Sequence, residues 1–406
     1  MALVNAMLHV LIEENLYDKE YVANYSEGFD KMWETVSKYT PENTAEITGL
    51  DPKVVREAVR MYAASPCSTI LWGMGVTQWG QGVETCMGLS NIAVITGNLG
   101  RPNVGVGPVR GQNNVQGSCD MGAVPGQFPG YQSVEDPEIR AKFEKAWGVE
   151  KLPAKKGIPI TEVGHNIEEG KIKAVYLFGE DPFQTEPDLA AVRHAYSQLE
   201  LFIAQDIFMT KSVAEADVVF PATSWGEHEG VYSAADRGFQ RFYKAVEPKG
   251  DVKPDWEIHS LMATAMGYPM KYNNTQEIWD EMRQLCPLYF GATYDKMAGL
   301  GYVPWPCLTE DDPGALWMYK GNRFATPNGK AQLIASEWRP PVDQVDSDFP
   351  LILSTVREVG HYSCRSMTGN CHALATLADE PGFAQMNPID ARELGIRDQQ
   401  LIWVEG

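Results

Sequence analysis

The sequence predicts an α/β fold made of doubly wound layers. Short apolar runs with the length of buried strands recur along the chain, at residues 68–72, 173–178, 201–206 and 217–221. Glycine-rich or polar loops follow these runs, and helical patterns then resume near residues 81–97 and 187–198. Strands that alternate with helices in this way form parallel sheets covered by helices.

Other helices are expected before the first strand and in the second half of the chain. Asp51 and Pro52 mark one helix start, because aspartate caps helices and proline suits the first helical position. Residues 225–345 are less regular, and apolar runs with strand character follow them. We expect helices at 2–14, 18–38, 51–63, 255–266 and 276–285, and strand character at 351–355 and 401–404.

Residues 101–131 show no periodicity and are rich in Gly, Pro, Asn and Gln. A stretch of this length without secondary structure is uncommon in a compact domain, and it usually carries function or is disordered. Its few charges and its spaced apolar residues favour function.

The composition excludes several classes of protein. The formal net charge of −20 argues against nucleic acid or an anionic membrane as the main partner. No apolar run approaches the length of a transmembrane helix, and no secretory signal opens the chain. Seven cysteines without a C-x-x-C pair indicate a reduced, cytoplasmic protein rather than a disulfide framework.

Polar or glycine residues follow three of the predicted strands, and ligands of open α/β sheets bind beyond the carboxyl ends of strands. Glycine-rich backbone at such an end can approach a phosphate, although a plain tight turn is as good an explanation. Carboxylates there can accept hydrogen bonds from a ribose or a guanine edge, or can simply cap the next helix. The candidate residues are Met74, Gly75, Gln78, Glu180, Asp181, Gln205, Asp206 and Thr210.

The run RGQNNVQG at residues 110–117 is the most informative segment. Arg110 stands among side-chain amides in an apolar, glycine-rich setting. Amides suit a heterocycle with mixed donor and acceptor edges, and an arginine fork can hold a carboxylate with two hydrogen bonds. A polar surface loop is the alternative explanation.

No metal ligand is predicted among these residues. The sequence WGEHEG at 225–230 lacks the second histidine of a zinc-protease helix. His361, Cys364, Cys371 and His372 have no common zinc spacing. Arg357, Glu358, His361 and Arg365 suit a large polar ligand instead.

Several runs together resemble the alpha subunits of formate dehydrogenases, in the dimethyl-sulfoxide-reductase family of molybdopterin enzymes. They include GMGVTQWGQGVE at 73–84, FGEDPFQTEPD at 178–188 and STVREVGHYSCRSMTGN at 354–370, besides RGQNNVQG. The likeness spans nearly the whole chain in the right order, and it is nearest to the hydrogenase-linked, selenocysteine type.

The resemblance implies two dinucleotide-binding α/β domains and a late β-barrel around a bis-molybdopterin guanine dinucleotide that carries Mo or W. Expected boundaries are 1–112 and 113–224 for the α/β domains, 225–345 for a connecting region and 346–406 for the start of the barrel. Arg110 would be the catalytic residue that orients formate. The cofactor would contact Met74, Gly75, Gln78, Gln112, Asn113, Asn114, Glu180, Asp181, Gln205, Asp206, Thr210, Arg357, His361 and Ser363.

The departures from the family pattern are as informative as the matching runs. The cysteine motif for a [4Fe–4S] cluster is missing, as is the Cys or selenocysteine that binds the metal. We expect a fragment cut at both ends, started at an internal Met after a selenocysteine codon, and inactive by itself. The implied parent oxidises formate to CO2 and passes electrons to iron–sulfur or hydrogenase subunits. A nitrate-type reductase and a non-catalytic cofactor-binding or scaffold subunit stay open as alternatives.

Overall fold

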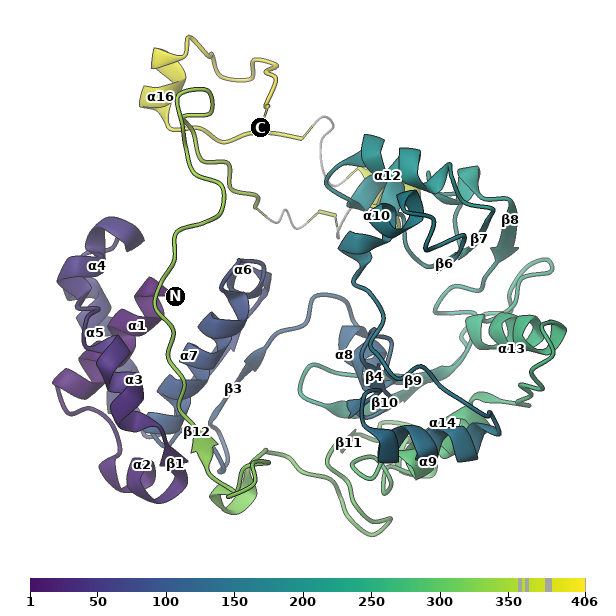
Figure 1. Ribbon diagram of the computed structural model, residues 1–406, viewed down its shortest axis with the longest axis horizontal. Helices are drawn as coiled ribbons and strands as arrows, with labels where there is room; N and C mark the ends of the chain where they lie inside the picture. The colour runs from purple at the N-terminus through teal and green to yellow at the C-terminus, as the bar shows by residue number, and fades with distance from the viewer. Residues whose placement is uncertain (357–359, 362–364, 377–381, 406) are drawn as a thin grey trace. The chain divides into compact units, whose positions relative to one another are not determined.

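The computed structural model describes residues 1–356, 360–361, 365–376 and 382–405 (Figure 1). The chain divides into two compact units, each assembled from three segments. Unit 1 comprises Met1–Gly157, Glu229–Tyr243 and Tyr272–Gln344, and unit 2 comprises Ile158–His228, Lys244–Lys271 and Val345–Gly406. Among the described residues, no helix has the length and apolar character needed to cross a bilayer.

Helices build the first part of unit 1 around one apolar core. The central helix α1 (Ala2–Glu13) contacts α3, α4, α5 and α7, and it buries Leu8 and Leu11 completely or nearly so. The helix α5 begins as expected, since Asp51 accepts a hydrogen bond from the Lys53 N–H and Pro52 occupies the first turn. The remaining helices are α2 (Lys19–Tyr25), α3 (Phe29–Val36), α4 (Pro41–Thr48), α5 (Pro52–Ala64) and α7 (Gly82–Ile95).

The single helix expected at 18–38 is wrong, because β1 (Ser26–Glu27) and Gly28 interrupt it. Strand β1 pairs in parallel with β12 (Ala331–Gln332). Gly28 has φ +88°, and a Cβ there would lie 2.7 Å from the Leu333 carbonyl oxygen. Only glycine allows the two backbones to approach so closely.

The segment after β12 continues along the helices of this part of unit 1 (Figure 1). Its backbone carbonyls accept hydrogen bonds from side-chain amides on the helical side. These bonds are Asn91 Nδ2 to Ile334 at 2.8 Å, Asn5 Nδ2 to Ser336 at 3.0 Å and Gln81 Nε2 to Glu337 at 2.8 Å.

A parallel strand pair precedes the predicted arginine loop. Strand β2 (Thr69–Trp72) pairs with β3 (Gly105–Pro108), and the one-turn helix α6 (Met74–Thr77) follows β2. The expectation that 101–131 lacks secondary structure is therefore wrong at β3 and at α8 (Val115–Asp120). Strand β3 has no strand pattern of its own, because it consists of Gly, Val and Pro. It is a strand because it forms backbone hydrogen bonds with β2.

The rest of unit 1 holds short strands and two helices around two further cores. The helices are α9 (Pro137–Trp147) and α14 (Thr275–Leu285). Strand β10 (Gly238–Phe242) lies between β9 (Gly230–Ser233) and β11 (Val303–Pro304) in an antiparallel sheet. Smaller elements are β4 (Gln127–Phe128), β5 (Gln132–Ser133), η3 (Asp295–Met297) and η4 (Lys320–Asn322).

Unit 2 contains a three-stranded parallel sheet in the order β6–β7–β8. The strands are β6 (Ala174–Phe178), β7 (Leu201–Asp206) and β8 (Val218–Pro221), which match the predicted runs closely. Helices connect them, and Phe183, Tyr196 and Phe202 form the core between helix and sheet. The helical elements are η1 (Ile160–Glu162), α10 (Val163–Glu168), α11 (Pro182–Thr185), α12 (Leu189–Tyr196), η2 (Val213–Glu215) and α13 (Asp255–Ala265).

The last segment has helical turns and, within its described residues, no strand. The helical turns are η5 (Thr368–Asn370), α15 (His372–Ala375) and α16 (Pro388–Glu393). The strand character expected at 351–355 and 401–404 is therefore wrong here. Ile352 is 85% exposed and Trp403 is 95% exposed, so neither run packs against a partner strand. The expected domain boundaries stay a prediction.

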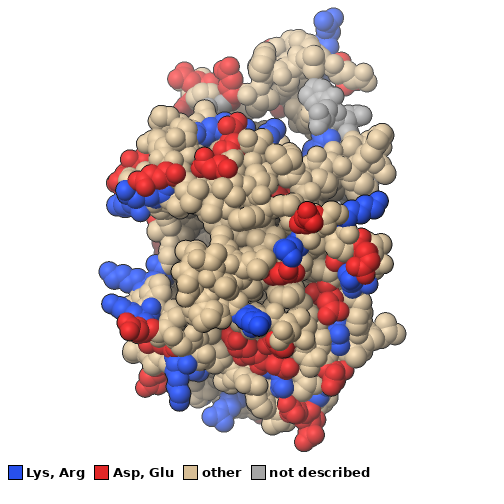
Figure 2. Space-filling view, turned by 90° about the vertical axis from the view of Figure 1, so that its right-hand side faces the viewer, with Lys and Arg blue, Asp and Glu red and all other residues tan. Residues whose placement is uncertain are grey.

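Charged side chains of both signs are interspersed on the face of the molecule in Figure 2. Acidic residues outnumber basic ones in the chain by 54 to 34.

Candidate functional site

A pocket of about 130 Å³ lies at the carboxyl ends of β6 and β7 in unit 2. This position is where open parallel sheets bind ligands. Three of the predicted residues come together there. The lining consists of Phe178, Gly179, Glu180, Gln205, Asp206, Ile207, Phe208, Ala222, Asp255, Ser366 and Met367.

Hydrogen bonds fix the polar groups of this pocket. Gln205 is 1% exposed, and its Nε2 donates to Asp255 Oδ1 at 2.5 Å, while the Tyr176 hydroxyl donates to its Oε1. Asp206 Oδ1 accepts from the backbone N–H groups of Ile207 and Phe208 at 2.6 and 3.0 Å. The pocket therefore presents preorganised carboxylates, and its other lining residues include the polar Gln205 and Ser366 besides apolar ones.

Two other predicted residues of this edge are turned inward. Asp181 is 2% exposed, and its Oδ1 accepts from the Ser212 backbone N–H at 2.9 Å and from the Ser212 hydroxyl at 2.6 Å. Thr210 is also buried and accepts from the Val213 N–H at 3.2 Å. Both side chains hold the loop after β7 in place, and neither lines the pocket.

The pKa of Asp206 is raised, first by burial and then by the neighbouring carboxylates of Asp181 and Asp255, against the two backbone hydrogen bonds. A raised pKa in the folded state means that the fold favours the protonated form. The associated stability is present below the unfolded pKa of about 3.9 and is lost as pH rises through the folded pKa.

Asp206→Asn is expected to raise the unfolding midpoint near pH 7, because asparagine keeps the acceptor oxygen without the half-buried charge. The gain should shrink as pH falls below the folded pKa and vanish below the unfolded pKa of about 3.9, where the carboxyl is protonated in both states. Denaturant unfolding at several pH values measures it, with Asp251→Asn, at an exposed position of the same unit, as the control. Lower stability of Asp206→Asn across the whole range would contradict the assignment.

His361 offers a free ligand-binding nitrogen in unit 2. The side chain is 8% exposed, and its Nδ1 lies 2.8 Å from the Thr368 hydroxyl. Its Nε2 is buried and has no hydrogen-bond partner among the described residues. A buried polar atom without a partner costs free energy, so a bound polar ligand is a natural partner. Arg357 and Ser363 lie outside the described residues.

Arg110 lies directly after β3 in unit 1 and is half-buried. Its Nε donates to Gln116 Oε1 at 3.2 Å. Gln112 and Asn113 are exposed beside it, as a ligand-binding loop requires. The Asn114 Oδ1 accepts from the Ser233 N–H at 3.1 Å and ties the loop to β9, and its contact with the cofactor stays a prediction.

Gly117→Ala is expected to release Asn114 from β9. A Cβ at position 117 would lie 2.1 Å from Asn114 Oδ1, so that side chain must move and its bond to Ser233 breaks. The expected loss is about 1 kcal/mol of unfolding free energy, measured by denaturant titration. Gly105→Ala is the control, because its added Cβ meets nothing within 4 Å. Equal effects of the two substitutions would contradict this explanation.

Gln116 belongs to the predicted amide-rich run, but Asp120, to which it is bonded, was not predicted as a site residue. Gln116 Nε2 donates to Asp120 Oδ1 at 2.8 Å, across one turn of α8. The signal was available, because Gln and Asp four residues apart on a helix face each other.

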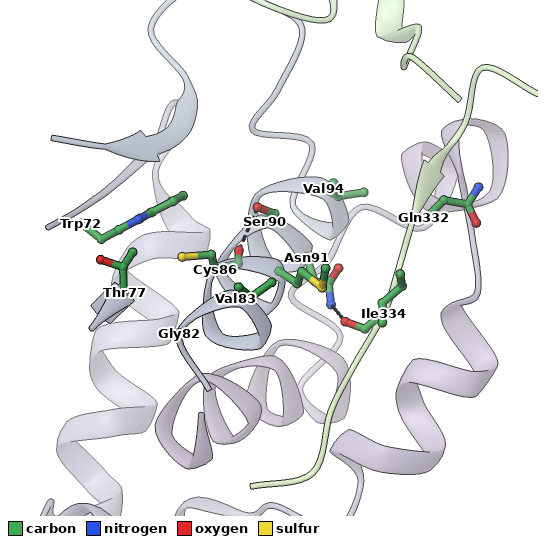
Figure 3. Close-up of a pocket in the computed structure, with 11 residues that line it drawn as sticks. Trp72, Thr77, Gly82, Val83, Cys86, Ser90, Asn91, Val94, Gln332 and Ile334 are labelled. Carbon is green, nitrogen blue, oxygen red and sulfur yellow. Dashed lines mark hydrogen bonds between the residues drawn. The ribbon is translucent and has the colours of Figure 1, made fainter. Parts of the chain in front are cut away.

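The other predicted residues, Met74, Gly75 and Gln78, lie on and just after α6. A Cβ on Gly75 would meet nothing within 4 Å, so its backbone faces open space. A pocket of about 480 Å³ lies next to this turn (Figure 3). Its lining includes Thr77 of the turn but none of the three predicted residues, and it consists of Trp72, Thr77, Gly82, Val83, Cys86, Met87, Ser90, Asn91, Val94, Gln332 and Ile334.

The walls of this pocket are mainly apolar, and two of its polar side chains are already bonded within the protein. The Ser90 hydroxyl donates to the Cys86 carbonyl at 2.9 Å, and Asn91 donates to Ile334 (Figure 3). The pocket therefore suits an apolar group better than a phosphate.

Two family models match this chain. One is described as molybdopterin oxidoreductase and matches residues 1–265, and the other as the molydopterin dinucleotide binding domain and matches residues 351–406. The chain therefore belongs to the molybdopterin oxidoreductase family.

The chain is also similar to curated formate dehydrogenases. Formate dehydrogenase H of Escherichia coli is 60% identical over 406 residues, which cover 100% of this chain and 57% of that protein. The F420-dependent formate dehydrogenase subunit alpha of Methanocaldococcus jannaschii is 41% identical and is covered to 59%. The chain thus spans under two thirds of the length of these relatives.

The fold is similar to that of acetylene hydratase from Pelobacter acetylenicus. The TM-score is 0.68 at 20% sequence identity, over 98% of this chain and 58% of that one. The predicted fold class is confirmed by this likeness and by the two family matches. The matches also support the expected cofactor, a molybdopterin guanine dinucleotide with Mo or W.

Proposed function

We propose that the complete protein is a molybdopterin-dependent formate dehydrogenase in which Arg110 binds the carboxylate of formate. The observation that carries the proposal is the arrangement of the Arg110 guanidinium. Its Nε is held by Gln116, and among the described residues no hydrogen bond occupies Nη1 or Nη2. Two parallel N–H groups of a guanidinium match the two oxygens of a carboxylate.

The residues of unit 2 are suited to the guanine end of the cofactor. Guanine presents neighbouring N–H donors, and the β6–β7 pocket presents the acceptor oxygens of Glu180, Asp206 and Asp255. The unpartnered Nε2 of His361 can bond to the pterin part. When bound, the cofactor supplies the two-electron redox chemistry of the metal.

The chain's own residues have separate tasks in this proposal. Arg110 neutralises the charge of formate and fixes its orientation, and Gln112 and Asn113 offer exposed amides to the cofactor. Met74, Gly75 and Gln78 border the second dinucleotide. Electrons leave to iron–sulfur or hydrogenase subunits in the cytoplasm.

The test is dye reduction by the complete, cofactor-loaded protein with formate, compared with nitrate-dependent oxidation of a reduced dye. Formate turnover without nitrate turnover is expected. The reverse result would make the protein a nitrate-type reductase. Metal analysis gives the third outcome, since a protein that contains neither Mo nor W would be a scaffold subunit.

A further inference from the structure

The carboxylate of Asp120 is the centre of a buried hydrogen-bond network in unit 1. Asp120 is 1% exposed. Its Oδ1 accepts from Gln116 Nε2 at 2.8 Å and from the Tyr131 hydroxyl at 2.9 Å, and its Oδ2 accepts from Trp305 Nε1 at 3.2 Å. All three donors are neutral, and together they use both oxygens of the carboxylate.

The network fixes which way the Gln116 amide points. Besides Asp120, Gln116 Nε2 donates to the Tyr131 hydroxyl oxygen at 2.8 Å, so both amide N–H groups are engaged. The amide oxygen must then face the opposite way, where it accepts from Arg110 Nε. Gln116 is only 6% exposed, so water does not compete for these bonds.

We propose that Asp120 is a positioning residue for substrate binding, acting through Gln116 on Arg110. This inference rests on the proposed function, because it assumes that Arg110 binds formate. Asp120 holds the amide nitrogen of Gln116, and the amide oxygen in turn holds Nε of Arg110. The guanidinium is thereby oriented with Nη1 and Nη2 available to the two carboxylate oxygens of the substrate.

The substitution Asp120→Asn tests the direction of these bonds while keeping the size of the side chain. Asparagine has one acceptor oxygen and one donor nitrogen, whereas the three neighbours of Asp120 all donate. If the new nitrogen faces Gln116, the Gln116 amide turns and presents N–H to the N–H of Arg110. If the nitrogen faces Trp305, two donors oppose each other there, and the network loosens.

A second variant covers the case in which Asp120→Asn does not fold. Gln116→Met has a similar shape and removes the acceptor for Arg110, while Asp120 keeps Tyr131 and Trp305. The matched control is Trp279→Phe. This substitution removes a buried hydrogen bond from Trp279 Nε1 to the Ala292 carbonyl, in the core that also contains Trp305. It leaves the Asp120 network intact.

Two measurements are made on the complete, cofactor-loaded protein. The first is KM and kcat for formate. The second needs no turnover: it is the formate concentration that halves the rate at which phenylglyoxal modifies Arg110, followed by peptide mass spectrometry. In Asp120→Asn and Gln116→Met, KM and the protecting concentration are expected to rise about tenfold, with kcat changed less than about threefold. Trp279→Phe should change neither.

The outcomes separate this inference from the proposed function. Formate turnover and protection that are unaffected by both variants would overturn the positioning role alone. The same shift in Trp279→Phe would also overturn it, because a general loss of stability would then explain the effect. An unsubstituted protein that shows neither formate turnover nor protection of Arg110 would count against the proposed function itself.

Discussion

Arg110→Gln is expected to lower kcat/KM for formate by at least about a hundredfold. The substitution removes a positive charge and the two N–H groups that match a carboxylate, and each hydrogen bond to a charged group contributes about 1.5–3 kcal/mol. Two such bonds correspond to a factor of roughly 10² to 10⁴. Steady-state dye reduction by the complete protein, with formate varied, gives the value.

Two further variants make this result specific. Arg110→Lys keeps the charge but lacks the planar fork, so it should recover only part of the lost activity. Arg60→Gln removes an arginine of α5 that is 56% exposed and paired with Glu14, and it should leave the kinetics unchanged. An Arg110→Gln protein with nearly normal kcat/KM would show that formate is held elsewhere.

Phe143→Ala is expected to give the largest loss of stability, about 3–5 kcal/mol of unfolding free energy. Phe143 is fully buried in a small aromatic core with Phe128 and Trp147, whose ring centroids lie 4.5 and 4.9 Å away. Removing the ring leaves a cavity that two other rigid rings cannot close. Denaturant unfolding, followed by tryptophan fluorescence, measures the change.

The turn after α8 lies close to this core. Gly122 follows α8 at φ +80°, and a Cβ there would lie 2.8 Å from the Phe128 backbone. Phe143→Leu, which keeps most of the apolar volume, should cost less than about 1.5 kcal/mol. Equal losses of unfolding free energy in Phe143→Ala and Phe143→Leu would contradict the tight packing of the Phe143 ring.

The sequence predicted those elements whose signal is local. The strands of unit 2 and the start of α5 were correct, because apolar runs and an Asp-Pro cap are properties of neighbouring residues. The break at Gly28 could not be predicted. Its cause is the backbone of Leu333, which no pattern near residue 28 reveals. Strand β3 was missed for the same reason, since its partner β2 lies more than thirty residues earlier.

The candidate site shows the same division. Strand ends located Glu180, Gln205 and Asp206 at one pocket, because the carboxyl ends of parallel strands meet at one edge of a sheet. The position of a residue after a strand could not show that Asp206 lines the pocket whereas Asp181 bonds to Ser212 instead. The amide-rich run was treated as one group, whereas burial divides it into exposed Gln112 and Asn113 and internal Gln116. The cofactor contacts of all these residues stay a prediction.

The segment from β12 to Glu337 has a consequence for biosynthesis. Asn5 and Ser336, which it joins by a hydrogen bond, are 331 residues apart in the chain. A ribosome that adds 5–20 residues per second needs on the order of 20 to 60 seconds between them. During that interval the side-chain amides of Asn5 in α1 and Asn91 in α7 lack the backbone carbonyls to which they donate in the folded chain. Folding of this part of unit 1 is therefore completed only after the later segment has been synthesised.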